Sequence, residues 1–137
     1  MAHFAKLNKQ INEDGTYTVI QVLTGSDDSN ETEISLRTGD LYKKCSYNTR
    51  AGIHYDPNTN QPSQDQSKAF RKNYPGIGWV YDPVKDCFHW PQQYSDWIWN
   101  EQSGEYQAPI PYPETQDAEG FHEKYNWIEN QGWVKAT

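Results

Sequence analysis

The chain has 137 residues and a formal net charge of −7; 34% of its residues are hydrophobic and 15% are aromatic. Its length fits one ordinary domain or two very small ones. The basic pairs Lys43-Lys44 and Arg71-Lys72 do not make the basic stripe that nucleic-acid binding needs, and no apolar run reaches membrane-spanning length, so neither nucleic acid nor a membrane is an expected partner.

The first predicted element is an antiparallel β-hairpin. Residues 3–7 alternate apolar and polar side chains, residues 16–23 are β-branched and aromatic, and the turn-forming run 12–15 lies between them. Residues 33–38 predict a short helix with Thr32 as its N-cap, and a strand is expected over 41–47.

The longest stretch without periodicity follows the predicted N-terminal strands. Residues 48–68 are rich in Gly, Pro, Asn, Ser and Gln. Irregular segments of this length are uncommon in compact domains and are often functional or ordered by a neighbour. The sequence therefore predicts an N-terminal β subdomain over 1–47, an irregular connector over 48–78 and a separate aromatic region over 79–137.

Three aromatic repeats organise the last sixty residues. In 79–91 and in 97–109 an aromatic residue opens the repeat, a second follows nine positions later, and a proline comes three positions after that. The third repeat, 125–134, is one residue shorter and lacks the proline. Alternating arms around turn-rich centres predict three β-hairpins. The expected fold class is therefore mainly β, with small antiparallel hairpins and long irregular loops.

The aromatic side chains of these repeats are the strongest functional candidates. Two interpretations stay open: they form an internal core, or they present a surface to a partner, where Trp and Tyr are enriched. The segment 108–113 (APIPYP) adds an extended, proline-rich arm suited to lying across a neighbouring subunit or a second copy of the chain. The partner-binding candidates are Trp79, Trp90, Trp97, Trp99, Tyr106, Pro109, Tyr112, Trp127 and Trp133.

Metal and cofactor signals are weak. Asp56, Asn58 and Asn60 match the start of a calcium loop, but its glycine and its bidentate glutamate are missing. The four histidines lack the tight spacing of a zinc site. No cofactor or metal is therefore predicted. Cys45 and Cys87 do not define a disulfide framework; two reduced thiols are expected, with a disulfide as the alternative.

Catalytic signatures are also missing from the sequence. Nothing in the chain matches a nucleophile elbow, a phosphate-binding loop or a catalytic triad. Among the many acidic residues, Asp82 and Asp86 could be considered as a glycosidase carboxylate pair, but nothing in the sequence selects this pair over others. Both fall in a predicted hairpin turn, where Asp is common. The sequence therefore predicts a protein that is not an enzyme.

Several segments resemble a small family of virion-associated proteins from marine tailed phages, the cyanophages. The resemblance covers most of the chain and is weakest over 25–40, and the run 91–97 departs from the family's proline-rich pattern. It rests on the segments 1–5, 46–50, 54–59, 71–74, 76–78 and 108–113, together with Trp127 and Trp133. What the resemblance implies is a component of a phage particle, with no catalytic residues to transfer.

The resulting expectation is a non-enzymatic virion protein, made in the host cytoplasm, that decorates or cements the outer surface of the capsid. Its expected partners are capsid or other virion proteins, or further copies of itself. Three alternatives are a tail- or neck-associated protein, a carbohydrate-binding module that contributes to host adsorption, and an assembly chaperone that is absent from the finished particle.

Overall fold

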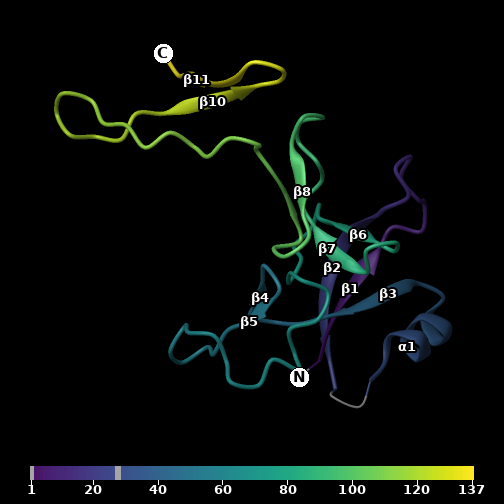
Figure 1. Cartoon of the computed structure of the whole chain (residues 1–137). Helices are drawn as coiled ribbons and strands as arrows, with labels where there is room; N and C mark the ends of the chain where they lie inside the picture. Colours follow the sequence, from purple (N-terminus) through teal and green to yellow (C-terminus); the bar gives the residue numbers. More distant parts are fainter. Residues whose placement is uncertain (1, 27–28) are drawn as a thin grey trace. The chain divides into compact units, whose positions relative to one another are not determined.

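The computed structural model describes residues 2–26 and 29–137 and confirms a mainly β fold built from antiparallel hairpins (Figure 1). No described helix is long and apolar enough to cross a membrane. The elements are β1 (Ala2–Leu7), β2 (Tyr17–Gly25), α1 (Glu31–Thr38), β3 (Leu41–Cys45), β4 (Thr49–Arg50), β5 (Ile53–His54), β6 (Val80–Asp82), β7 (Cys87–His89), β8 (Ile98–Asn100), β9 (Glu105–Gln107), β10 (Tyr125–Ile128) and β11 (Gly132–Lys135).

The largest assembly is a five-stranded sheet in the order β3-β1-β2-β6-β7. Each of its strand pairs is antiparallel. β1 lies between β3 and β2 and aligns Phe4 with Leu23 of β2 on one side and with Lys44 of β3 on the other. The first aromatic hairpin, β6–β7, joins this sheet because β6 pairs with the start of β2, placing Tyr17 opposite Tyr81. β4–β5, β8–β9 and β10–β11 are separate two-stranded sheets.

Each face of β1 packs against a different hydrophobic cluster, so residues on both faces of the strand are buried. Ala2 and Phe4 pack on one face with Tyr42, and Ile34 of α1 lies against this cluster. On the other face Ala5 and Leu7 join a second cluster. Side chains two positions apart share a face of a strand, so the two clusters follow from the alternation along β1. The remaining buried members of the second cluster are Val19, Cys45, Tyr81 and Phe88.

Helix α1 begins two residues earlier than predicted and has a different cap. The side chain of Asn30, not that of Thr32, accepts a hydrogen bond from the backbone N–H of Glu33 at 2.8 Å. Asn30 has the extended backbone that an N-cap requires, whereas Thr32 lies inside the first helical turn. Gly39 ends the helix with a φ of 76°, a left-handed conformation that glycine adopts at little cost.

The three aromatic hairpins form where the sequence predicts them. In β6–β7 the Asp82 carboxylate accepts from the backbone N–H groups of Val84 and Lys85 at 3.0 and 3.1 Å. In β8–β9 the Asn100 side chain makes the equivalent bonds to residues 102 and 103. In β10–β11 Asn130 and Gly132 have positive φ values of 66° and 100°. Each turn is thus set by Asx hydrogen bonds or by left-handed residues.

The connector over 48–68 is more ordered than its composition suggests. It contains the short β4–β5 hairpin, and Gln66 bonds both backbone groups of His54, accepting at 2.9 Å and donating at 3.0 Å. The Ser46 hydroxyl donates to the Lys68 carbonyl, and Thr49 donates to the Ser46 hydroxyl at 2.8 Å. Hydrogen bonds of polar side chains therefore connect this segment to itself and to Ser46.

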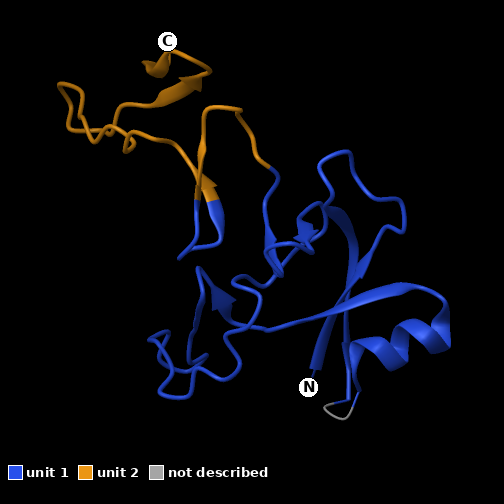
Figure 2. Cartoon of the chain, turned by 45° about the vertical axis from the view of Figure 1, so that its right-hand side comes forward, with its two compact units in different colours: residues 1–91, 100–105 blue, residues 92–99, 106–137 orange. Residues whose placement is uncertain are grey.

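The chain divides into two compact units, which do not follow the predicted boundaries at residues 47 and 78 (Figure 2). Unit 1 comprises residues 1–91 and 100–105 and holds the five-stranded sheet, α1 and β4–β5. Unit 2 comprises residues 92–99 and 106–137 and holds β10–β11, the proline-rich segment and the arms of the second aromatic hairpin. The predicted aromatic region is thus shared, because its first hairpin belongs to the unit 1 sheet.

Candidate binding surfaces

Three tryptophans form the centre of unit 2. The ring centroids of Trp127 and Trp133 lie 5.2 Å apart with an interplanar angle of 80°. Trp97 lies 6.1 Å from Trp127 and 6.4 Å from Trp133. These distances and angles are typical of edge-on and tilted aromatic packing. Three of the predicted partner-binding residues therefore pack against one another within unit 2 and are here called the tryptophan cluster. Trp127 is buried, and Trp97 and Trp133 are half-buried.

The tryptophan cluster is framed by hydrogen bonds from a loop far away in sequence. The Asp96 carboxylate accepts from the Trp127 indole N–H at 3.0 Å and from the Asn130 backbone N–H at 2.9 Å. The bond from Asn130, followed by that from Trp127, lowers the pKa of Asp96. The Trp133 indole N–H donates to the Ile110 carbonyl at 2.8 Å. The loop before β8 and the proline-rich segment are thus fixed to β10–β11.

The proline-rich segment packs within unit 2. The Tyr112 ring lies edge-on to Trp133 at 4.9 Å and to Tyr125 at 5.9 Å. The Tyr112 hydroxyl also accepts from the Tyr125 backbone N–H at 2.8 Å. One face of Tyr112 therefore belongs to the cluster, while 46% of the residue stays exposed, and Pro109 is exposed as well.

Large apolar side chains remain exposed on unit 2. Phe121 is 71% exposed, although its backbone is held in a turn by the Asp117 carboxylate at 3.0 Å. Single exposed apolar residues are normal on protein surfaces, so each of these side chains is an individual candidate for contact with a partner. The other members of this exposed set, each at least 39% exposed, are Ile98, Ile110, Tyr112, Ile128 and Val134.

The remaining predicted residues form two separate pairs. Trp79 and Trp90, both in unit 1, meet edge-on at 6.1 Å; Trp79 packs against the core and Trp90 is 45% exposed. Trp99 and Tyr106 face each other across the arms of β8–β9 at 5.2 Å. The nine predicted residues therefore do not form one surface; seven of them, all except Pro109 and Tyr112, are cluster or pair contacts that support local folding.

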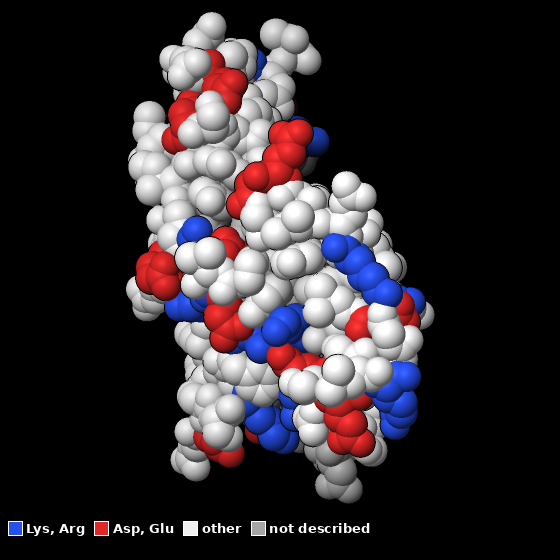
Figure 3. Space-filling view, turned by 90° about the vertical axis from the view of Figure 1, so that its right-hand side faces the viewer, with Lys and Arg blue, Asp and Glu red and all other residues white. Residues whose placement is uncertain are grey.

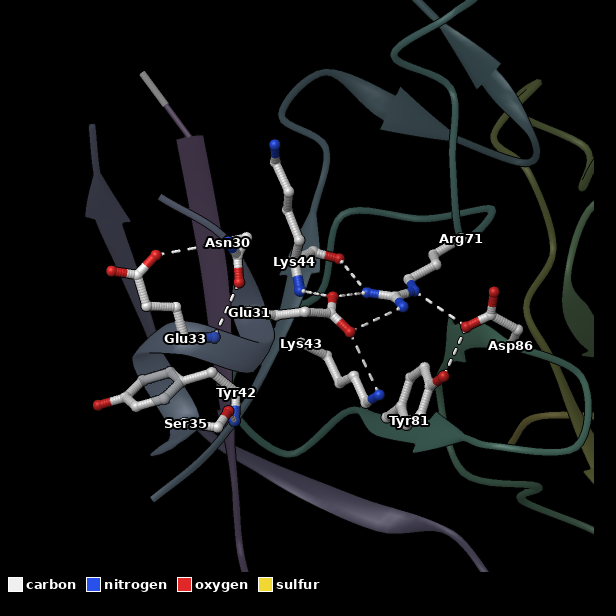
Figure 4. Close-up of polar contacts among 10 residues, drawn as sticks. All are labelled: Asn30, Glu31, Glu33, Ser35, Tyr42, Lys43, Lys44, Arg71, Tyr81 and Asp86. Atoms are coloured by element: carbon white, nitrogen blue, oxygen red, sulfur yellow. Dashed lines mark hydrogen bonds and ion pairs between the residues drawn. The ribbon is translucent and has the colours of Figure 1, made fainter. Parts of the chain in front are cut away.

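An ion-pair network that the sequence analysis did not identify joins α1 to two distant loops (Figure 4). Both guanidinium NH groups of Arg71 contact the Glu31 carboxylate, at 2.5 and 3.2 Å. The Arg71 Nε donates to Asp86 at 2.9 Å, and the Tyr81 hydroxyl donates to the same carboxylate oxygen at 2.5 Å. Lys43 adds a contact to Glu31 at 3.2 Å.

The charged groups of this network stabilise one another's ionised forms. Burial acts to raise the pKa of Glu31, but hydrogen bonds from Arg71 and Lys44 and the charges of Arg71 and Lys43 outweigh it and lower the pKa to about 2. Burial likewise acts against the charge of Arg71, but its bonds to Glu31 and Asp86 raise its pKa. Each charged group is paired, so the network holds the fold and leaves no group free to react.

The carboxylates and the calcium-like motif are also engaged in local structure. Asp82 bonds its own turn and Asp86 bonds Arg71 and Tyr81, so neither resembles a free acid or base. Asp56 accepts from the Asn58 backbone N–H at 2.8 Å, the Asx turn typical of such loops. Among the described residues, no group of three or more His, Cys, Asp or Glu side chains could hold a metal ion.

A cavity of about 670 Å³ opens in unit 1 where β1 and β3 meet the connector. Ala2 and His3 of β1 form one wall, and residues 44–48 form a second. The connector closes it with His54, Pro57, Lys68 and Phe70.

Cys45 lines the cavity but is buried, and burial raises the pKa of its thiol to about 12. Cys45 and Cys87 are both free and buried, which agrees with the expectation of two reduced thiols.

The charged side chains on the face of the chain drawn in Figure 3 do not share one sign. On this face, basic and acidic side chains lie among one another, with no continuous basic stripe.

Comparison with known proteins identified no relative of the chain. No family model, no curated protein and no solved structure matches it.

Proposed function

We propose that the chain is a non-enzymatic virion protein of a tailed phage, attached to the outer surface of the head as a decoration or cement protein through unit 2. The observation that carries the proposal is a contrast within unit 2. Two members of its tryptophan cluster, Trp127 and Trp133, donate hydrogen bonds within the unit. In contrast, Ile110, Phe121 and Ile128 are left exposed. The sequence resemblance to cyanophage virion proteins supplies the class of partner.

The affinity of one copy attached through such a surface is weak, but many copies bound to one capsid are held firmly. Fully burying one large apolar side chain contributes roughly 1.5–3 kcal/mol, and association costs several kcal/mol in lost freedom. Three such side chains therefore give modest affinity per contact. Repetition of the contact over a capsid lattice raises the overall avidity without new interactions.

The decisive experiment compares exposed apolar residues on the two units. Phe121→Ser and Ile110→Ser remove side chains from the unit 2 surface, and Val84→Ser removes one that is 92% exposed in a unit 1 turn. We expect the unit 2 variants to fold normally and to lose cosedimentation with capsid shells, and Val84→Ser to bind like the natural chain. Normal attachment of both unit 2 variants would contradict the proposal.

Electron cryomicroscopy of purified particles tests the location independently. Density that repeats over the head lattice supports decoration, whereas density confined to the neck or tail assigns the chain to adsorption or tail assembly. Absence of the chain from particles contradicts the proposal and favours a chaperone.

A second function is favoured by the exposed aromatic faces of Trp90 and Tyr112, which are 45% and 46% exposed. Sugar rings stack on such faces, so a carbohydrate-binding role in host adsorption fits them. A shift of tryptophan fluorescence on adding host glycans, absent in Trp90→Ala, supports this role; unchanged fluorescence contradicts it.

A further inference from the structure

The cavity of unit 1 has the size and setting of a ligand site. Its volume of about 670 Å³ lies within the ~300–1,000 Å³ range of small-molecule sites. The polar side chains of the connector bond one another and the β4–β5 hairpin, so the walls are formed without a ligand.

The lining of the cavity reverses the charge balance of the chain. The sequence contains 19 acidic and 12 basic residues, yet two lysines and two histidines line the cavity and no Asp or Glu does. The Lys44 side chain points away from the Glu31–Arg71 network in Figure 4. Neither Lys44 nor Lys68 forms an ion pair with a described acidic side chain. The site is therefore suited to an anion.

An acidic residue just outside the cavity is already bonded to its own loop. The Asp65 carboxylate accepts from the Ser67 backbone N–H at 2.9 Å, and that bond and the Ser67 hydroxyl lower its pKa more than the charge of Lys68 does. Asp65 therefore stays ionised and offsets part of the positive charge of Lys68.

Aromatic side chains form part of the lining, and Tyr74 packs against two of them from outside it. The His3 and Tyr47 rings stack at 5.2 Å with an interplanar angle of 17°, and Tyr74 meets both edge-on. Burial and the nearby N-terminus lower the pKa of His3, so its ring is uncharged near neutral pH. Tyr47 is 55% exposed and Phe70 also lines the cavity, which leaves aromatic surface for a ligand ring.

We propose that this cavity binds a small organic anion that carries a flat ring, with the ring against Tyr47 and Phe70 and the anionic group near Lys44 and Lys68. Aromatic carboxylates and aromatic phosphate esters share this chemistry. The site lies wholly within unit 1, so it is independent of the attachment surface proposed for unit 2.

Titration of the full-length, nitrogen-15-labelled chain with benzoate, phenyl phosphate and benzamide tests the proposal. We expect saturable shifts at the amides of Tyr47, His54 and Lys68, with dissociation constants on the order of 1 mM for ligands of this size. Benzamide matches benzoate in shape and lacks its charge, so it should bind at least about tenfold more weakly. The stronger of the two anions identifies the preferred anionic group.

Charge variants assign the binding to the cavity. Lys44→Glu with Lys68→Glu should weaken binding of both anions by about tenfold or more. Lys124→Glu, at an exposed site in unit 2, should change nothing, and Asp65→Asn should tighten binding slightly. Lys68→Ala tests the same contact if the double variant does not fold. Equal binding of benzamide and benzoate, no saturable shift, or unchanged binding in folded Lys44 and Lys68 variants would overturn the proposal.

Discussion

Asp96 accepts a hydrogen bond from the indole N–H of Trp127 across 31 positions of the chain, at 3.0 Å. Its second carboxylate oxygen accepts from the Asn130 backbone in the β10–β11 turn. One side chain thus positions both the buried ring of Trp127, which is 7% exposed, and the turn that follows it. The Glu129 carboxylate of the same turn adds a second link to the loop that carries Asp96, because it accepts from the backbone N–H and the hydroxyl of Ser95.

Asp96→Ala should therefore loosen unit 2 and leave unit 1 folded. Four of the six tryptophans lie in unit 2, so tryptophan fluorescence and near-ultraviolet circular dichroism report chiefly on this unit. We expect a red-shifted emission, weaker near-ultraviolet signals and a lower thermal midpoint. Glu114→Gln, an exposed change in the same unit, serves as the control. An unchanged spectrum in Asp96→Ala would show that the cluster does not depend on this bond.

Trp97 offers a sharper test of the cluster. Its ring contacts Tyr94, Trp127 and Trp133, but its buried indole nitrogen has no hydrogen-bond partner among the described residues. Trp97→Phe keeps much of the packing and removes the unsatisfied donor, so its effect should stay within about 1 kcal/mol. Trp97→Ala removes the ring and should cost roughly 2–4 kcal/mol in the free energy of unfolding. Chemical denaturation followed by fluorescence measures both; equal effects would contradict a packing role.

Acid should weaken unit 1 through Glu31. The pKa of this carboxyl is about 2 in the folded chain, against an ordinary value of 4.5. The folded state therefore binds the proton more weakly, so the stabilisation is fully present above pH 4.5 and is lost as the pH falls towards 2. Because the side chain is partly exposed, we discount the full shift and expect a contribution of roughly 1–2 kcal/mol.

Glu31→Gln should remove this contribution at neutral pH and flatten the loss of stability between pH 4.5 and 2. Glu33→Gln is the matched control, because Glu33 lies in the same helical turn and is exposed. Urea denaturation over this pH range gives both curves. Parallel curves for the natural chain and Glu31→Gln would show that the ion pair with Arg71 does not stabilise the fold.

Local chemistry explains which features could be predicted from the sequence. The hairpins were predictable because each turn is specified by residues within it, such as Asp82, Asn100 and Gly132. The cap of α1 was misplaced by two residues because Asn30 and Thr32 are both good caps, and only the backbone conformation distinguishes them.

Long-range pairings account for what the sequence could not reveal. Glu31 and Arg71 are 40 positions apart and each is an ordinary charged residue in its own segment. β6 pairs with β2 through only two aligned residue pairs. So short a contact leaves no periodic pattern in the sequence that would assign the first hairpin to unit 1. The cavity lining comes from three separated segments, none of which forms a motif.

Asn73 is another residue that only the fold identifies. Its buried side-chain amide donates to the carbonyls of Phe88 and Gly104, each at 3.1 Å, and its carbonyl oxygen accepts from the Ala51 backbone at 2.8 Å. Asn73→Asp replaces the donor with a carboxylate oxygen that faces two carbonyls, so we expect a loss of roughly 2–4 kcal/mol in unfolding free energy. Asn58→Asp, in an exposed turn, should be nearly neutral. Equal stability of both variants, measured by urea denaturation, would exclude this bonding role for Asn73.

The two cysteines should be inert in the folded chain. Burial raises the pKa of Cys45 to about 12 and that of Cys87 to about 11, against an ordinary value of 9.0. Near pH 8 the thiolate fraction of each should then fall at least about a hundredfold below that of an unfolded thiol. A chromogenic disulfide reagent should label neither residue until urea unfolds the chain. Val84→Cys places a thiol at a 92% exposed site and should react at once. Rapid labelling of native Cys45 would show that the wall between the core and the unit 1 cavity is open to solvent.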